Sequence, residues 1–224
     1  MYAMSADLYD APHQFEPLLP SAARQEPLLV KAHDLATAAT AFSSQPIASQ
    51  MRGLLAAMNS YYSNRIEGQH TRPHELEQAL RRDFSQDANL AARQRLALAH
   101  IDAEAELEQR YQGEAGAKAL YGLPAVCDIH RAIFSRLSVS DRVTGQGEAI
   151  VPGEIRRREV SVGRHVAPAF ESVGRFLGRW GEVYGGVRRG EAALVAMAAA
   201  HHRLGWIHPF VDGNGRVMRL HTHT

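Results

Sequence analysis

The residues with the most chemical potential lie in one segment near the C-terminus, from His208 to Arg219. Its sequence is His-Pro-Phe-Val-Asp-Gly-Asn-Gly-Arg-Val-Met-Arg. Glycines on both sides of Asn214 permit positive φ angles and leave backbone N–H groups uncovered, which an anion-binding concavity requires. A helix that begins near Asn214 would add the positive end of its dipole. The segment therefore predicts a phosphate-binding loop at the start of a helix.

The charged side chains of this segment suit the same kind of ligand. Arg216 and Arg219 are three positions apart, so both project from one face of the predicted helix, where both can grip a polyphosphate. Asp212 supplies a hard oxygen ligand for Mg²⁺. His208 is the only base of the set that works near neutral pH. A glycine-rich turn with two solvent-facing arginines is the alternative, but the joint pattern favours transfer of part of a nucleoside triphosphate to a hydroxyl.

The same segment resembles the motif of the Fic/Doc (Fido) family, HPFx(D/E)GNGRxxR, and matches it at every specified position. The resemblance extends from about Leu123 to the end of the chain. It implies a helical core with a β-hairpin flap, and adenylylation (AMPylation) of a protein hydroxyl from Mg-ATP. It also implies the role of each motif residue: general base, His208; Mg²⁺ ligand, Asp212; anion hole around the α- and β-phosphates, Gly213, Asn214 and Gly215; grip on the β- and γ-phosphates, Arg216 and Arg219.

Residues 152–163, Pro-Gly-Glu-Ile-Arg-Arg-Arg-Glu-Val-Ser-Val-Gly, are similar to the flap segment of that family, PGxxR…VxIG. In the family this flap aligns the main chain of a target by strand addition. The resemblance implies a docking role for seven residues: Gly153, Glu154, Ile155, Arg156, Val160, Val162 and Gly163. The alternative is an ordinary surface hairpin in which Arg156 to Arg158 form a solvated basic face.

A second motif, Ser63-Asn64-Arg65-Ile66-Glu67-Gly68, matches the inhibitory pattern of the family, (S/T)xxxE(G/N). Its place upstream of the core resembles the class with an N-terminal inhibitory helix. The resemblance implies that Ser63, Glu67 and Gly68 are inhibitory, and that Glu67 pairs with Arg219 and blocks the productive γ-phosphate position. In some members the same glutamate also positions a water that reverses the modification. Taken alone, the motif is short, and Glu67 would then only end a solvated helix.

The elements that must position these residues are mostly helices. Apolar residues recur at spacings of three and four over seven stretches, which are 28–42, 47–66, 73–84, 89–111, 123–137, 168–184 and 190–204. Residues 155–162 form the one extended segment. We therefore expect a mainly α fold, a Fic-type helical core with a short β-hairpin flap. The expected organisation is an irregular N-terminal arm at 1–27, a helical region at 28–112 that carries the inhibitory motif, and the Fido core at 123–224.

Composition sets limits on partners and compartment. The 224 residues carry 25 basic and 24 acidic side chains, so the net charge of +1 offers no argument for a nucleic-acid or membrane partner. No apolar run approaches the roughly 20 residues of a bilayer-spanning helix, and residues 1–20 do not resemble a secretion signal. Cys127 is the single cysteine, which excludes an intramolecular disulfide. A cytoplasmic protein is expected.

Several histidines near the C-terminus do not have the spacing of a zinc site. His201 and His202 are adjacent, so they point to different sides of a helix, and no cysteine is nearby. His221 and His223 are expected in a frayed, solvated tail. His130, which lies among apolar residues, is expected to be a satisfied core histidine.

The expected substrate is ATP with Mg²⁺, and the expected partner is a protein with a Ser, Thr or Tyr hydroxyl. Self-modification and a homo-oligomer are further expectations. No direct nucleic-acid binding is expected. Transfer of UMP, phosphocholine or phosphate, de-AMPylation, or a non-catalytic nucleotide-binding regulatory module are the alternatives. The motif helix of the family continues further than Thr224, five residues after Arg219. A truncated chain, or a core completed by a partner, is therefore expected.

Overall fold

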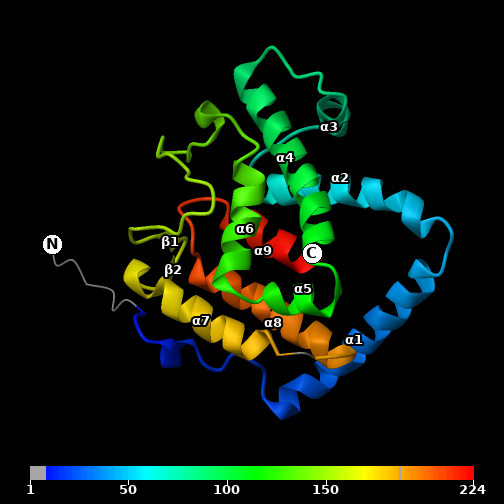
Figure 1. The fold of residues 1–224 in the computed structure, drawn as a ribbon, viewed down its shortest axis with the longest axis vertical. Coiled ribbons are helices and arrows are strands. Elements are labelled where there is room, and N and C mark those ends of the chain that lie inside the picture. Colours follow the sequence, from blue (N-terminus) through cyan, green and yellow to red (C-terminus); the bar gives the residue numbers. More distant parts are fainter. Residues whose placement is uncertain (1–8, 187) are drawn as a thin grey trace.

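The computed structural model describes residues 9–186 and 188–224 and is mainly helical (Figure 1). Over these residues the helices are α1 (Ala22–Ser43), α2 (Ala48–Ile66), α3 (Pro73–Leu80), α4 (Ala88–Arg110), α5 (Gly113–Ala119), α6 (Leu123–Phe134), α7 (Val173–Tyr184), α8 (Glu191–Ile207) and α9 (Asn214–His223). The 3₁₀ turns are η1 (Pro12–Phe15), η2 (Val139–Asp141) and η3 (Phe170–Ser172). The strands are β1 (Ser161–Val162) and β2 (His165–Val166), an antiparallel pair. The expected mainly α fold with a short hairpin is confirmed.

The helices that carry the candidate site pack around one hydrophobic core. Helix α8 lies against α1, α7 and α9, while α6 lies against α4, α7 and α9. Figure 1 shows α4 and α6 side by side, with α7 and α8 crossing below them. The largest side chains at the centre are fully buried and come from several of these elements: Trp180, Phe15, Phe134, Phe176 and Phe210. Helix α9 is therefore held from three sides, by α2, α6 and α8.

The N-terminal segment differs from the irregular arm expected at 1–27. Residues 1–8 lie outside the described residues. Phe15 is 0% exposed and Leu18 is 4% exposed, and both belong to the core. Helix α1 begins at Ala22 and contains Pro27, although an interior proline removes one backbone hydrogen bond. The expected irregular arm therefore ends earlier than predicted and buries more apolar surface than predicted.

Two other elements correct the sequence interpretation. Residues 155–160 do not form a strand, and the strand pairing is limited to β1 and β2. The side chain of Arg156 is buried, so side chains do not simply alternate between polar and apolar faces over this segment. Helix α5 lies between two of the stretches expected to be helical, 89–111 and 123–137, and was not predicted. Gly113 has φ +77° at the first position of that helix.

The end of the chain is also better ordered than expected. His221 is 4% exposed, its ring lies edge-on to Tyr121 and Trp180, and its Nε2 is 3.1 Å from the carbonyl oxygen of Leu120. Burial lowers the pKa of His221 to about 4. The frayed tail expected for this residue is wrong, because the imidazole fills the space between α5, α7 and α9.

Helix α2 rests on the core through small polar residues. Its fully buried residues are Ser60, Ser63 and Asn64. Ser60 Oγ donates to the carbonyl oxygen of Ala97 in α4 at 2.7 Å, and Asn64 Nδ2 donates back to the Ser60 carbonyl oxygen at 2.9 Å. The outer face of α2 exposes apolar side chains instead, and Leu54 is an example at 55%. In the described part of the chain, no helix is long and apolar enough to cross a bilayer.

The burial of Phe15 gives a direct test of the docked N-terminal segment. Its ring centroid lies 5.5 Å from that of Phe176 and 5.0 Å from that of Trp206. We expect Phe15→Ala to lower the free energy of unfolding by about 3–5 kcal/mol in urea titrations. Phe42→Ala, at a residue that is 42% exposed, should lower it by less than about 1 kcal/mol. Equal effects of the two substitutions would contradict a docked segment.

Candidate active site

The candidate site is built on the connection between α8 and α9. Helix α8 ends at Ile207 because His208 adopts the left-handed conformation, with φ 51°. Pro209 follows, and the chain then turns at Gly213, whose φ is +81°, to start α9 at Asn214. An added Cβ at Gly213 would lie 2.5 Å from Cε2 of Phe134, so only glycine fits this turn without a shift. The predicted loop and helix start are both found.

Asn214 closes the loop with its side chain. Its Oδ1 accepts from the N–H of Phe210 at 2.8 Å, and its Nδ2 donates to the carbonyl oxygen of Phe210 at 2.8 Å. The ring of Phe210 is fully buried and stacks on His130 with centroids 4.0 Å apart. The Asn214 side chain is thus committed to the loop. Any contribution of Asn214 to an anion hole has to come from its backbone N–H.

Gly215 also has a steric use that the sequence did not indicate. It lies inside α9 and does not have a positive φ. An added Cβ would lie 1.9 Å from Oε1 of Glu67 and 3.0 Å from Nη1 of Arg219. The missing side chain therefore makes room for the carboxylate that approaches from α2.

Arg216 is buried and only partly hydrogen-bonded. Its side chain is 4% exposed, and Nη2 donates to Oδ1 of Asp212 at 2.9 Å. The guanidinium carbon lies 5.5 Å from the ring centroid of Phe134. The Nε and Nη1 atoms are buried and have no partner among the described residues. Unpaired buried donors of this kind cost about 1–3 kcal/mol each, so the geometry favours an acceptor such as a phosphate oxygen beside Arg216.

Arg219 is held by the end of α2. Its Nε donates to Ser63 Oγ at 2.9 Å, and its Nη2 donates to the Ser63 carbonyl oxygen at 3.3 Å. Nη2 also forms an ion pair with Oε1 of Glu67. Glu67 is the C-terminal cap of α2, and Gly68 follows with φ +77°. Ser63, Glu67 and Arg219, which are far apart in sequence, therefore meet.

His208 has the protonation state that a general base needs. Its Nδ1 is 3.3 Å from the carbonyl oxygen of Gly205, which assigns the N–H to Nδ1 and leaves Nε2 free to accept a proton. Burial lowers the pKa of His208 from its ordinary value of 6.5, although the contact with Gly205 opposes the shift. The imidazole is therefore neutral at pH 7.

Asp212 lies between two open spaces. One is a groove of about 450 Å³ that His208, Val211 and Asp212 share with Val160 and Ser161 of the flap segment. The other, of about 350 Å³, is lined by Asp212 and Arg216 together with residues of α4 and α6. A ligand that spans Asp212 would thus face the imidazole on one side and the Arg216 guanidinium on the other.

The donor set around Asp212 fits Mg²⁺ bound with phosphates. Oδ1 accepts from the N–H of Gly213 at 2.5 Å and from Arg216, while Oδ2 has no hydrogen bond from the described residues. No group of three or more metal-ligating His, Cys, Asp or Glu side chains occurs in the part of the chain that the structure describes. Mg²⁺ prefers such a setting, because it binds one or two carboxylates, keeps several waters and takes the rest of its ligands from substrate phosphates.

The seven flap residues are divided between surface and interior. Val162 and Gly163 are exposed, as is Glu154, and Val160 is partly buried beside the groove. Gly153 donates its N–H to Nδ1 of His130 at 2.8 Å.

Two of the seven flap residues point into the protein and not toward a target. Ile155 packs against the core. Arg156 has a fully buried side chain, so it cannot contact a target, and the alternative of a solvated basic face is equally wrong for it.

Arg93 of α4 was missed by the sequence analysis. It lines the smaller space next to Arg216, and its Nε is buried with no partner among the described residues. One arginine among many on a long helix carries no signal of this placement. His130, expected in the core, is 1% exposed there.

Comparisons with known proteins match the part of the chain that contains this site. The profile of the Fic/DOC family matches residues 121–224. Over 89 residues the chain is 39% identical to the Protein adenylyltransferase Fic of Drosophila virilis and 38% identical to that of Drosophila grimshawi, matches that cover 39% of this chain and 18% of each relative. The matched segment is therefore less than a fifth of each relative.

A solved structure supports the fold over nearly the whole chain. The crystal structure of a Fic family protein from Desulfovibrio desulfuricans G20 superimposes with a TM-score of 0.58 at 16% sequence identity. The alignment covers 96% of this chain and 58% of that one. At this identity the likeness extends to the fold alone.

The buried position of His208 predicts its titration. Because burial disfavours the charged imidazolium, we expect a pKa below 6.5 when the His208 ring is followed by NMR between pH 4 and 8. The sign also fixes a stability effect. A depressed pKa means that the folded state binds fewer protons than the unfolded state. The contribution of His208 to the free energy of unfolding is therefore fully present above pH 6.5 and is lost as the pH falls through the pKa of the folded state. A His208 pKa above 6.5 would contradict a buried, neutral imidazole.

Proposed function

We propose that this chain, which carries a Fic/DOC family domain over residues 121–224, is a protein adenylyltransferase that transfers AMP from Mg-ATP to a hydroxyl group of a protein. The observation that carries the proposal is the buried Arg216 guanidinium at the start of α9, whose Nε and Nη1 have no partner among the described residues, with a neutral His208 in the groove on the other side of Asp212. An anion site and a base on either side of one carboxylate are what nucleotidyl transfer to a hydroxyl requires. The names of the partial relatives point to the same reaction.

The triphosphate would lie on the first turn of α9. The N–H groups of residues 214–216 have no intrahelical partner at a helix N-terminus, and the helix dipole favours negative charge there. The two unpaired donors of Arg216 supply further hydrogen bonds. Mg²⁺, held by Asp212 and the phosphates, supplies neutralisation of negative charge when it is bound.

His208 would act on the hydroxyl of the target. Its free Nε2 accepts the hydroxyl proton as the oxygen attacks the α-phosphorus. The new P–O bond forms while the bond to the β-phosphate oxygen breaks, so AMP remains on the target and pyrophosphate leaves. The groove that His208 shares with Val160 and Ser161 gives the target its route to the base.

The exposed edge of the flap would hold the target chain. Val162 and Gly163 are exposed, and β1 pairs only with β2 on its other side among the described residues. A target segment added to β1 would gain main-chain hydrogen bonds and bring its hydroxyl to the groove.

Glu67 would hold the enzyme in a state of low activity. Its ion pair with Arg219, reinforced by Ser63, occupies the guanidinium that a γ-phosphate needs. A carboxylate and a phosphate compete for the same fork of donors, so the nucleotide would bind in an unproductive position until α2 moves. The room left by Gly215 supports this reading, since any side chain there would collide with the carboxylate.

Removal of the Glu67 charge tests this competition. We expect Glu67→Gln and Glu67→Gly to increase the transfer of label from α-³²P-ATP to protein by at least about tenfold, which corresponds to about 1.4 kcal/mol of activation free energy. Glu182→Gln is the matched control, because the Glu182 side chain is 70% exposed and pairs with Arg179 within α7. Equal labelling by the wild-type and both Glu67 variants would contradict inhibition by Glu67.

The role of His208 is tested in the activated Glu67→Gly protein. His208→Ala should lower the transfer rate by roughly 10²- to 10⁴-fold, the usual contribution of a general base, while the affinity for Mg-ATP stays within about threefold. His202→Ala, on the exposed side of α8, is the control. Unchanged labelling by the His208→Ala protein would defeat the assignment of the base. Mass spectrometry of the modified target separates AMP from UMP, phosphocholine and phosphate.

A further inference from the structure

The side chain of Arg156 is the most completely buried cation of the described residues that the proposed chemistry does not use. It is 0% exposed, although arginine is rarely buried without a tight partner. Among the described residues, the one carboxylate within ion-pair distance is that of Glu159, whose Oε2 is 3.7 Å from Nη1 and whose side chain is 41% exposed. Burial lowers the pKa of Arg156, with the charge of Glu159 acting in the opposite direction. A weakly paired buried guanidinium needs another source of stabilisation.

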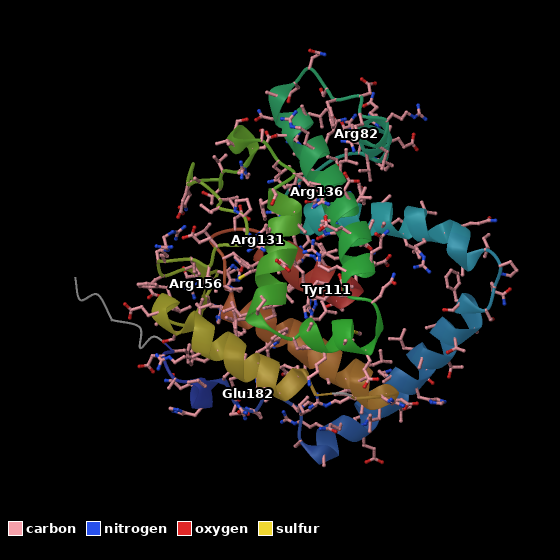
Figure 2. The ribbon with its side chains drawn as sticks, viewed as in Figure 1. Arg82, Tyr111, Arg131, Arg136, Arg156 and Glu182 are labelled. Atoms are coloured by element: carbon pink, nitrogen blue, oxygen red, sulfur yellow. The ribbon has the colours of Figure 1, made fainter. Side chains whose placement is uncertain are left out.

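Backbone carbonyl oxygens supply that stabilisation. Nε of Arg156 donates to the carbonyl oxygen of His208 at 2.8 Å, Nη1 to that of Arg158 at 2.9 Å, and Nη2 to that of Pro168 at 2.5 Å. The backbone N–H of Arg156 donates to the carbonyl oxygen of Pro209 at 2.9 Å. Arg156 thus makes two hydrogen bonds to the turn formed by His208 and Pro209. It makes one more to each of the chain segments on either side of the β1–β2 hairpin. In Figure 2 Arg156 is labelled beside the flap.

The turn that receives these bonds needs outside support. His208 has a positive φ, which among the described non-glycine residues is shared only with Arg82. This conformation is unfavourable for a residue with a Cβ, and it persists where the surroundings hold it. The Asn214 side chain holds the loop from the α9 side. Arg156 holds it from the flap side.

We propose that Arg156 is a positioning residue that ties the target-docking flap to the turn of His208, so that the docking edge and the imidazole are held in one fixed relation. Arginine suits this role because its planar fork presents donors in three directions at once. Lysine keeps the charge but offers its donors from a single atom, and it cannot reach three carbonyl groups in the same directions. The inference rests on the proposed function, in which His208 is the base and the flap receives the target.

The test uses Arg156→Lys and Arg156→Gln in the full-length Glu67→Gly protein. Arg179→Lys is the matched control, since the Arg179 guanidinium pairs with Glu16 and Glu182 far from the flap. We expect both Arg156 variants to fold and to lower kcat by at least about tenfold, because misplaced reacting groups lose rate steeply. The KM for ATP should change by less than about twofold, because the triphosphate contacts are on α9.

A spectroscopic readout separates this role from general stabilisation and from the activity itself. The ring ¹⁵N resonances of His208 should shift in Arg156→Lys and stay unchanged in Arg179→Lys, while the buried ring of His221 stays unchanged in both. Arg156 variants with unchanged kcat and unchanged His208 resonances would overturn the proposal. A rise in the KM for ATP as large as the loss of kcat would also overturn it, as would the failure of both Arg156 variants to fold. If the Glu67→Gly protein transfers nothing at all, the proposed function fails, and the His208 resonances still decide the role of Arg156.

Discussion

The two hydrogen bonds between the Asn214 side chain and the backbone of Phe210 are the contact on which the site depends. They close the loop between α8 and α9, and a loop of this kind has no secondary structure of its own to fix it. On one side of the closed loop is His208, and on the other is the first turn of α9 with Arg216. The buried Phe210 ring anchors the loop against His130. Without this closure, the distance between His208 and the first turn of α9 would not be fixed.

The second determinant is the set of contacts that α2 makes with Arg219. Helix α2 brings Ser63 and Glu67 to the guanidinium, yet its fully buried residues are small and polar. A fully buried apolar side chain would add about 1.5–3 kcal/mol to its docking, and α2 has none among its described side chains. The helix is thus attached mainly through hydrogen bonds and the ion pair itself. In the proposed function, this makes the inhibitory contact strong enough to direct the nucleotide and weak enough to be displaced.

The sequence predicted what local patterns determine and missed what depends on tertiary contacts. Apolar periodicity located most helices, and the glycines around Asn214 located the turn into α9. The directions of individual side chains did not follow from the pattern. Asn214 faces its own loop because the Phe210 backbone is within reach, and Arg156 points inward because three carbonyl groups converge there. The burial of Phe15, in the segment expected to be an irregular arm, and of His221, expected in a solvated tail, was missed for the same reason: their partners are distant in sequence.

The most direct test of the central claim is a crystal structure of the Glu67→Gly protein with Mg²⁺ and a non-hydrolysable ATP analogue. The account predicts phosphate density over the N–H groups of residues 214–216, with both Arg216 and Arg219 in contact with phosphate oxygens and Nε2 of His208 facing the α-phosphorus. A nucleotide bound in another cavity, or an imidazole turned away from the α-phosphate, would contradict it.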